Sequence, residues 1–208
     1  MPQPVPQAVV LRLPRYYRCL RELLNNDVLL VKSKELAEMM GITASQVRSD
    51  FNYFGDFGRQ GYGYNVRNLY KNINAILGIT DEYSAVIIGA GELGTVLAGD
   101  SMFMRRGVIL RGIFDTDEEI IGREIAPDLI VRDITEFEKF CKSKKIDIAV
   151  LTKFPEYAEK LIRCGISGIW NFTGVALRNT GDATIQDIYL GDTLMTLCYN
   201  MKRNEREK

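Results

Sequence analysis

Apolar side chains recur at two different periods along the chain, and the period changes near residue 84. Before that point they return every three or four residues, which predicts amphipathic helices. The first helix begins at Pro14 and ends at the Asn25-Asn26-Asp27 run, and the apolar segment from Val28 to Val31 can form a strand. The residues before Pro14 hold three prolines and show little periodicity, so we expect a loose leader there.

Two short helices separated by a tight turn follow. Ser33 is expected to cap a helix over residues 34–40, and Gly41 suits the left-handed conformation just past its end. Thr43 opens a T-x-x-Q capping box, and with it a second helix that reaches about Tyr53. This layout is typical of a helix-turn-helix.

Residues 55–64 combine glycines with aromatic side chains. Four glycines fall within residues 55–63, a composition typical of a β-hairpin. A further helix over residues 66–77 has apolar positions at helical spacing and stops at Gly78. The helix-turn-helix, the hairpin as a wing and the closing helix together predict a winged-helix domain over residues 1–78.

Beyond residue 84, short apolar runs alternate with helical patterns. The runs predict strands at residues 85–88, 108–114, 146–151, 166–170 and 184–188. Helices are expected at residues 134–144 and 155–164. This alternation is typical of βαβ units, so we predict an α/β fold with a parallel-sheet Rossmann domain over residues 79–190.

Residues 191–208 predict a terminal amphipathic helix and a charged tail. The helix runs from Asp192 to about Arg203, and Leu190-Gly191 is expected to separate it from the sheet. Its apolar face comprises Leu194, Leu197, Cys198 and Met201. Two interpretations stay open: the helix packs on its own core, or it is exchanged with a partner subunit in a dimer.

A glycine-rich loop follows the first strand of the second domain. Its G-x-G-x-x-G consists of Gly89, Ala90, Gly91, Glu92, Leu93 and Gly94. Asp115, 21 residues further on, ends the next strand, which matches the layout of a dinucleotide site. Gly89 permits a tight turn, Gly91 lets backbone N–H groups approach a pyrophosphate, and Gly94 lets helix pack on strand.

Asp115 is also informative about the kind of dinucleotide. A carboxylate at this position accepts hydrogen bonds from ribose hydroxyls and repels a 2′-phosphate, so we expect NAD(H) rather than NADP(H). The alternative is a glycine turn that serves the fold alone.

The second helix of the helix-turn-helix carries side chains that can read DNA. Ser45, Gln46, Arg48, Ser49 and Asn52 lie on one side of it. Glutamine and arginine read base edges in the major groove, and serine and asparagine bind phosphates or bases. Arg59, at the wing tip, can enter the adjacent minor groove. The alternative is a helical domain that mediates protein contacts only.

Charge adds to this picture, because the net charge of zero conceals two opposite parts. Residues 1–78 hold 10 basic and 6 acidic side chains, and the remainder holds 17 and 21, so the parts carry +4 and −4. The chain has no histidine, which excludes Ser-His-Asp catalysis and histidine-ligated metals. No pair of carboxylates stands out as an acid/base dyad, so we expect that the protein is not an enzyme.

Other features bear on the compartment and the core. The longest uncharged stretch has 13 residues, shorter than the roughly 20 that span a membrane, so we expect a cytoplasmic protein. The four cysteines include no C-x-x-C pair, and we expect reduced thiols rather than a metal site. Four tyrosines can stack on a ligand, but we favour packing roles for Tyr16, Tyr17, Tyr62 and Tyr64.

These features together resemble the Rex family of redox-sensing transcriptional repressors over about residues 14–200. The matching motifs are residues 33–38, 46–51, 53–58 and 61–64 in the first domain, and residues 89–94, 114–115, 151–152 and 171–172 in the second. The block Tyr53-Phe54-Gly55-Asp56-Phe57-Gly58 is the most specific of them.

The resemblance implies a homodimer that binds palindromic operators through two winged helices. NADH would rearrange the domains and release the DNA, whereas NAD⁺ would compete without releasing it. The implied DNA contacts are Ser45, Gln46, Arg48, Ser49, Arg59, Gln60 and Tyr62. The implied NAD(H) contacts are Gly89, Ala90, Gly91, Glu92, Leu93, Gly94, Asp115, Thr152, Asn171 and Phe172.

The chain departs from the family pattern at several positions. Ser49 and Phe51 replace the usual lysine and leucine, and Gln60 follows Arg59 where the arginine is usual. The usual Thr-Val-Pro becomes Thr-Lys-Phe-Pro at residues 152–155, and Asn-Phe-Ala-Pro becomes Asn-Phe-Thr-Gly at residues 171–174. The family aspartate that can pair with the arginine matched by Arg18 corresponds to Tyr189.

Three hypotheses follow. The first is a Rex-like repressor that senses the NADH/NAD⁺ ratio. The second keeps DNA binding but drops the preference for NADH, because the departures at residues 152–155 and 171–174 cluster on the nicotinamide half. The third is an NAD-dependent oxidoreductase, in which Lys153 or a tyrosine would have to replace the missing histidine.

Overall fold

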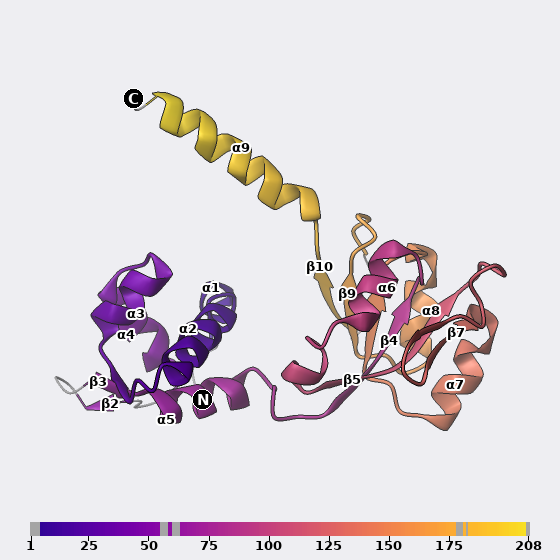
Figure 1. The fold of residues 1–208 in the computed structure, drawn as a ribbon, viewed down its shortest axis with the longest axis horizontal. Coiled ribbons are helices and arrows are strands. Elements are labelled where there is room, and N and C mark those ends of the chain that lie inside the picture. The colour runs from indigo at the N-terminus through magenta and orange to yellow at the C-terminus, as the bar shows by residue number, and fades with distance from the viewer. Residues whose placement is uncertain (1–4, 55–57, 60–62, 178–180, 182, 207–208) are drawn as a thin grey trace. The chain divides into compact units, whose positions relative to one another are not determined.

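The computed structural model describes residues 5–54, 58–59, 63–177, 181 and 183–206 (Figure 1). The chain forms two compact units, residues 1–81 and 82–208. The boundary between them lies just beyond the expected end of the first domain at residue 78.

The first unit is mainly helical. In chain order its elements are α1 (Gln7–Val10), α2 (Leu13–Asn25), β1 (Leu30–Val31), α3 (Ser33–Met40), α4 (Ala44–Asn52), β2 (Gly58–Arg59), β3 (Gly63–Asn65) and α5 (Val66–Ile76). The three strands form an antiparallel sheet in the order β1-β3-β2. The predicted helix-turn-helix, formed by α3 and α4, and the wing are therefore confirmed.

Its core lies where the helices meet the small sheet. The largest fully buried side chains are Tyr16, Leu20, Leu36, Leu69 and Ile73. Gly41 ends α3 in the left-handed conformation, with φ at 63°, as its position predicted. Tyr16 and Tyr17 are buried in this core and Tyr64 packs against it, whereas Tyr62 lies outside the described residues.

The expectation of a loose leader before Pro14 is wrong for its second half. Residues 7–10 form α1, and α2 begins at Leu13. Val9 and Leu13 are buried, and Arg12 reaches a buried carboxylate on α4. Helix α1 has a single buried residue, Val9, so it leaves no periodic apolar pattern, and the prolines alone gave the wrong prediction.

The predicted cap of α3 is also wrong by one position. Ser33 is the first residue of the helix, and Lys32 precedes it in an extended conformation. The Glu35 carboxylate accepts the Lys32 backbone N–H at 2.6 Å, which fixes the start of the helix. The hydroxyl of Ser33 accepts from Arg48 Nη1 at 3.2 Å instead. Thr43 caps α4 as predicted, because its Oγ1 accepts the backbone N–H of Gln46 at 3.1 Å, which is one of the two hydrogen bonds of the expected capping box.

The second unit is an open α/β structure. In chain order its elements are β4 (Tyr83–Ile88), α6 (Glu92–Gly99), a 3-10 turn (Met104–Arg106), β5 (Val108–Asp115), β6 (Glu124–Ala126), β7 (Leu129–Asp133), a 3-10 turn (Ile134–Glu136), α7 (Phe137–Ser143), β8 (Ile148–Leu151), a 3-10 turn (Pro155–Tyr157), α8 (Ala158–Arg163), β9 (Gly168–Asn171), β10 (Thr184–Asp187) and α9 (Leu190–Arg206).

Its sheet has seven strands in the order β10-β9-β8-β4-β5-β7-β6. All neighbours are parallel except β6, which pairs antiparallel with β7. Taken in chain order, the six parallel strands have the Rossmann arrangement 3-2-1-4-5-6. The strand order therefore reverses between β4 and β8, and ligands of such sheets bind at this point.

Apolar clusters cover both faces of this sheet. Val86 and Ile88 of β4 join a cluster that contains Phe137 and Phe140 of α7. Ile87, between them, faces the other cluster, against which Leu97 of α6 packs. The alternation along β4 thus buries both faces, as expected of a central parallel strand.

Two strands of this sheet were not predicted. Residues 115–133 were left without an element, yet β6 and β7 occupy part of them. The apolar run in β7, residues 129–131, is three residues long, shorter than the four to eight residues expected of a strand. Asp128, with φ at 63°, lies between the two strands in the left-handed conformation that glycine usually adopts in turns, so no glycine marks this turn in the sequence.

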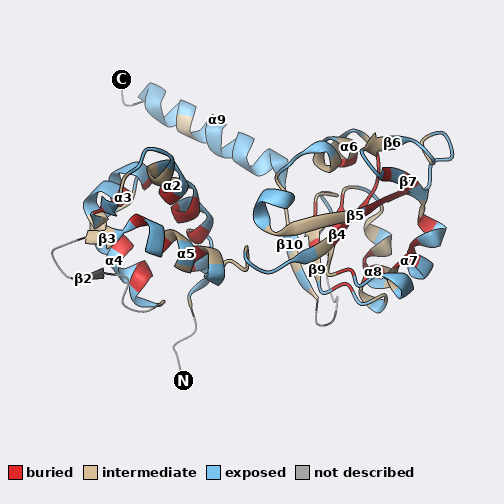
Figure 2. Cartoon of the chain, turned by 60° about the horizontal axis from the view of Figure 1, so that its bottom comes forward, coloured by how far each residue is buried: buried red, intermediate tan, exposed pale blue. Residues whose placement is uncertain are grey.

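Helix α9 has no buried residue, and Figure 2 shows it in the exposed colour along nearly all its length. It begins at Leu190, so Leu190 and Gly191 belong to the helix instead of separating it from the sheet, a correction of the sequence prediction. Its exposed apolar residues are Leu190, Leu194, Met195, Leu197, Tyr199 and Met201. Among the described residues, no helix is long and apolar enough to cross a membrane.

Candidate functional site

The glycine-rich loop lies at the switch point of the large sheet. Strand β4 ends at Ile88, which pairs with Leu151 at the end of β8 and with Phe114 near the end of β5. The backbone N–H of Gly89 donates to the carbonyl of Phe114 at 2.8 Å, so the loop continues the sheet before it turns into α6. The three strand ends bring the loop, Asp115 and Thr152 together.

Two of the three glycines are required by close packing. Gly89 has φ at 102°, and a Cβ on it would lie 2.5 Å from Thr152 Oγ1. A Cβ on Gly94 would lie 1.9 Å from the Gly89 carbonyl oxygen. Helix α6 therefore rests directly on the loop backbone, as the fingerprint requires.

The third glycine, Gly91, is the N-cap of α6 and offers no side chain to its first turn. The first backbone N–H groups of a helix lack intrahelical partners, and the helix dipole favours an anion at that end. A Cβ on Gly91 would lie 3.0 Å from Lys153 Cε and 3.2 Å from its Nζ. The loop thus forms a cradle of backbone donors with a lysine beside it, which fits the pyrophosphate of a dinucleotide.

Asp115 is buried beneath this loop, with 1% of its surface exposed. Its Oδ2 accepts the backbone N–H of Ala90 at 2.5 Å, and its Oδ1 accepts those of Thr116 and Asp117 at 2.7 and 3.1 Å. The residue expected to bind ribose therefore also ties the end of β5 to the glycine loop. A carboxylate has about four acceptor positions, so these three bonds leave room for another donor.

Thr152, at the end of β8, holds the loop from its other side. Its hydroxyl lies 2.8 Å from the Gly89 carbonyl oxygen and 3.1 Å from that of Ile88. With this hydroxyl engaged by the protein backbone, the structure gives Thr152 a loop-positioning role.

Asn171 is the most completely engaged of the expected cofactor residues. Its amide nitrogen donates to the Val175 carbonyl at 2.7 Å and to Asp187 Oδ1 at 2.6 Å. Its amide oxygen accepts the backbone N–H and the hydroxyl of Thr173 at 3.1 and 2.8 Å. Asn171 therefore orders the segment after β9. Phe172 packs beside it with its ring centroid 4.6 Å from that of Trp170.

The remaining expected cofactor contacts lie in the first turn of α6 and in the loop before it. Glu92 is exposed, Leu93 is half-buried, and Ala90 is buried against the α6 side of the sheet. The structure thus brings the loop residues, Asp115 and Thr152 to one place, whereas Asn171 and Phe172 follow the adjacent strand β9.

In the first unit, α4 presents the residues expected to bind DNA on its exposed side. Val47, Asp50 and Phe51 are buried, and the positions between them face outward. The expected contacts that are exposed are Ser45, Gln46, Arg48 and Ser49. Arg59 belongs to strand β2, but its side chain, like Gln60 and Tyr62, lies outside what the structure describes.

A buried polar network that sequence reasoning missed fixes α4 from behind. Arg12 donates from Nε and Nη2 to the two oxygens of Asp50, both at 2.7 Å, and the Tyr16 hydroxyl donates to Asp50 Oδ2 at 2.8 Å. The hydrogen bond to Asp50 raises the pKa of Arg12, and burial together with the same carboxylate raises the pKa of Tyr16. An aspartate on an otherwise apolar helix face was the available signal.

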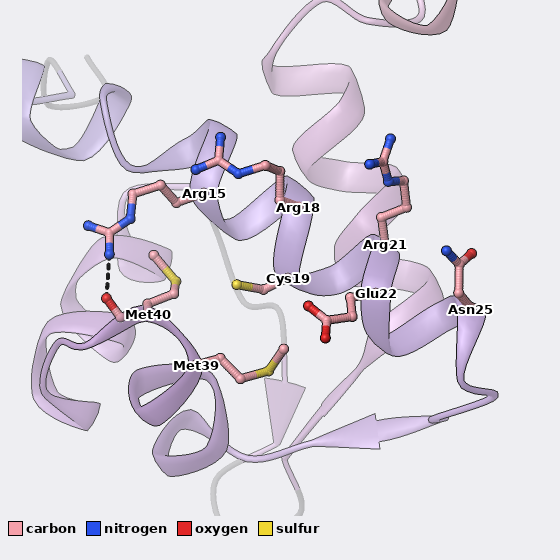
Figure 3. Close-up of a pocket in the computed structure, with 8 residues that line it drawn as sticks. All are labelled: Arg15, Arg18, Cys19, Arg21, Glu22, Asn25, Met39 and Met40. Carbon is pink, nitrogen blue, oxygen red and sulfur yellow. Dashed lines mark hydrogen bonds between the residues drawn. The ribbon is translucent and has the colours of Figure 1, made fainter. Parts of the chain in front are cut away.

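A groove of about 610 Å³ lies between α2 and α3 (Figure 3). Three arginines on successive turns of α2, Arg15, Arg18 and Arg21, line it together with the side chains of Met39 and Met40. Arg15 donates to the Met40 carbonyl, whereas Arg18 is exposed in the groove. The groove is therefore a basic feature of the winged helix, separate from the exposed face of α4.

The two folds and the two sites define the class of protein. A winged-helix domain is followed by a Rossmann domain of the dinucleotide-binding type, which is the domain architecture of a ligand-responsive transcription regulator. Comparison with known proteins agrees. A family model described as "Putative DNA-binding protein N-terminus" matches residues 4–52, and one described as "CoA binding domain" matches residues 80–175.

Relatives match over nearly the whole chain. The redox-sensing transcriptional repressor Rex of Caldanaerobacter subterraneus subsp. tengcongensis is 45% identical over 97% of this chain and 91% of its own length. Crystal structures of RSP, described as a Rex-family repressor, give TM-scores of 0.88 to 0.89. The complex with β-NAD⁺ and operator DNA is 44% identical and covers 98% of this chain and 95% of its own; the complex with β-NADH is 42% identical and covers 97% and 96%. The chain therefore belongs to the Rex family of redox-sensing transcriptional repressors.

Proposed function

We propose that this protein represses transcription by binding a palindromic operator as a homodimer, and that NADH releases it. The observation that carries the proposal is that one chain combines two features. These are helix α4, whose expected DNA contacts are exposed, and a complete G-x-G-x-x-G loop of the kind that binds dinucleotides. Relatives named as redox-sensing repressors support it, as do RSP structures that contain NAD⁺ with operator DNA and NADH.

In the Rossmann domain, NAD(H) would bind over the glycine loop. The backbone donors around Gly91 would receive the pyrophosphate, and Asp115 would accept one adenosine ribose hydroxyl at its remaining acceptor position. Asp115 would disfavour NADP(H), because a buried carboxylate repels a 2′-phosphate. Thr152 and Asn171 would act indirectly, by holding the loop and the segment after β9.

In the winged helix, the exposed side of α4 would enter the major groove. Gln46 and Arg48 would read base edges, and Ser45 and Ser49 would contact phosphates or bases. Arg59, Gln60 and Tyr62 of the wing are proposed to contact the neighbouring minor groove. The net charge of +4 over residues 1–78 doubles to about +8 in a dimer, which favours association with DNA.

Helix α9 supports a dimer. Its apolar residues are exposed, and monomeric proteins rarely expose contiguous apolar patches of this kind. A second copy of the chain would bury them, as the exchanged terminal helix of the sequence prediction requires. Two copies related by a two-fold axis also suit a palindromic operator.

Regulation would follow from linkage between the two sites. NADH can shift the dimer away from its DNA-binding arrangement only by the difference in its affinity for the two arrangements. We assign the protein no catalytic step, and as a DNA-binding regulator it would act in the cytoplasm.

A gel-shift titration tests the proposal. A promoter palindrome should bind at low salt, NADH should release it, and NAD⁺ should protect it against NADH. Failure to bind any palindrome at low salt contradicts the DNA-binding part, because basic contacts with phosphate strengthen as salt falls.

The departures at residues 152–155 and 171–174 favour a second candidate, a DNA-binding relative that does not distinguish the two redox forms. Calorimetry with NADH and NAD⁺ separates the two. A preference for NADH of tenfold or more, about 1.4 kcal/mol, supports the redox sensor. Equal affinities support the second candidate.

A further inference from the structure

The side chain of Lys153 lies over the glycine loop of the proposed NAD(H) site. An ideal Cβ on Gly91 would be 3.2 Å from Lys153 Nζ and 3.0 Å from Cε. The ammonium therefore stands beside the backbone that opens α6. Among the described residues, no carboxylate oxygen lies within 4.0 Å of Nζ, and the centroid of the Phe154 ring is 5.9 Å from it.

The backbone around Lys153 holds this residue next to the loop. Its backbone N–H donates to the carbonyl of Ile88, the last residue of β4, at 3.3 Å. The next residue, Phe154, adopts a left-handed conformation with φ at 60°. The Phe154 ring packs against the apolar cluster on the α7 and α8 side of the sheet and against Tyr157, 6.1 Å between centroids. Lys153 is thus fixed between the end of β4 and a packed aromatic side chain.

Charge at the loop supplies the chemical reason for a cation. Glu92, in the first turn of α6, is exposed and carries a negative charge next to the backbone donors. A pyrophosphate brings two further negative charges to the same place, so Glu92 alone would oppose its binding. An ammonium beside Gly91 offsets that repulsion and can donate directly to a phosphate oxygen.

We propose that Lys153 binds the pyrophosphate of the dinucleotide and is a determinant of affinity that this chain adds to its glycine loop. The proposal rests on the function proposed above and names a residue for it. Because NADH, NAD⁺ and ADP-ribose share the pyrophosphate, Lys153 should strengthen the binding of all three to the same degree and leave the preference between redox forms unchanged.

Calorimetry on the full-length protein with these three ligands tests the proposal. Lys153→Met should weaken the binding of each ligand about tenfold, the loss expected for one charge-assisted hydrogen bond. Lys153→Arg, which keeps the charge, should stay within about threefold of the original protein. Lys139→Met, an equal change of charge at an exposed position on α7, should leave all three affinities unchanged. Raising the salt concentration should reduce the difference in ligand affinity between Lys153→Met and the original protein, because salt screens the charge of the lysine.

Two results would overturn the assignment while the proposed function stands. One is an ADP-ribose affinity that Lys153→Met leaves unchanged. The other is a loss for NADH without a loss for ADP-ribose, which would move Lys153 to the nicotinamide half. If the unmodified protein binds none of the three ligands, the proposed function itself fails and Lys153 fails with it. Thermal unfolding of Lys153→Met serves as the folding control.

Discussion

Arg12 and Asp50 join the beginning of α2 to the recognition helix α4 by two hydrogen bonds of 2.7 Å each. Asp50 is 1% exposed, and Tyr16 donates a third bond to it. The three bonds satisfy a carboxylate that sits on the buried side of α4. The outward direction of the α4 side chains that would read DNA therefore depends on a segment far from them in sequence.

Replacing Arg12 with methionine should destabilise the first unit by about 3 kcal/mol, because it leaves a buried carboxylate without its charged partner. Tyr16→Phe removes one of three bonds and should cost about 1–2 kcal/mol. Circular dichroism during a urea titration follows the unfolding of both units. The fluorescence of the single tryptophan, Trp170 on β9, reports the second unit alone.

Only the circular dichroism transition should therefore shift in the two variants. Arg67→Met, at an exposed position of α5, removes the same charge and should shift neither signal. An Arg12→Met protein as stable as its parent would show that the pair contributes nothing to holding α4.

Ser49 stands where the family pattern has a lysine, on the exposed side of α4. Ser49→Lys should tighten DNA binding and make it more sensitive to salt. Each added phosphate contact steepens the plot of log affinity against log salt by about 0.9. Fluorescence anisotropy at several salt concentrations measures both quantities, with Ser49→Ala as the neutral control. An unchanged slope for Ser49→Lys would place this side of α4 away from the DNA backbone.

Gly94 and Gly99 lie on the same helix, α6, but differ in what surrounds them. A Cβ on Gly94 would be 1.9 Å from a backbone oxygen, whereas one on Gly99 meets nothing within 4 Å. Gly94→Ala should abolish NADH binding and lower the Trp170 unfolding transition. Gly99→Ala should bind NADH normally and gain up to about 1 kcal/mol from helix propensity. Calorimetry and urea unfolding measure these effects, and equal behaviour of the two variants would contradict the packing of α6 on the loop.

The exposed apolar side chains of α9 lead to a prediction about assembly. Leu194→Glu combined with Leu197→Glu should produce a monomer in sedimentation velocity, because the charges oppose burial against a second copy. Loss of the paired winged helices should weaken binding to a palindrome by about a hundredfold or more. Asn204→Glu, an added charge near the end of the same helix, should remain dimeric. A double variant that stays dimeric would exclude α9 from the interface.

The Cys141 thiol should respond slowly to alkylation in the folded protein. Burial, with a smaller contribution from Cys164, raises its pKa from 9.0 to about 11. At pH 8 the thiolate fraction is then roughly a hundredfold lower than in the unfolded chain, and the higher intrinsic reactivity of a more basic thiolate recovers about tenfold of this loss. Iodoacetamide labelling followed by mass spectrometry should show Cys141 reacting roughly tenfold more slowly in the folded protein.

The same shift has a consequence for stability. The pKa of Cys141 is higher in the folded than in the unfolded chain, so its contribution to stability is complete below pH 9 and is lost as the pH rises through about 11. Cys141→Ala should flatten the dependence of stability on pH in this range. In the iodoacetamide experiment, equal labelling rates of Cys141 in the folded and unfolded chain would contradict the burial of this thiol.

The sequence predicted those parts of the fold that depend on local pattern. The helix-turn-helix followed from Gly41 and the Thr43 capping box, and the central strands from their apolar runs. It missed α1 because Val9 is the one buried residue of that four-residue helix, and it missed β7 because the apolar run at residues 129–131 is only three residues long. Elements this short leave too few apolar positions for periodicity to reveal them.

The candidate site divides in the same way. Gly89, Gly94 and Asp115 were identified by spacing, and the strand ends bring them together. The surroundings of Asn171 and Lys153 could not be predicted, because they depend on contacts with residues far away in the sequence or in the following loop. Asn171 makes its hydrogen bonds with Thr173, Val175 and Asp187, and Lys153 lies beside the loop because its backbone bonds to Ile88.

NADH and operator DNA should oppose each other on one dimer, and by linkage each ligand should weaken the binding of the other by the same factor. The most direct measurement is the affinity for NADH, by calorimetry, with and without a saturating operator palindrome. We predict that the operator weakens NADH binding by the same factor by which NADH weakens operator binding. An NADH affinity that the operator leaves unchanged would contradict the account.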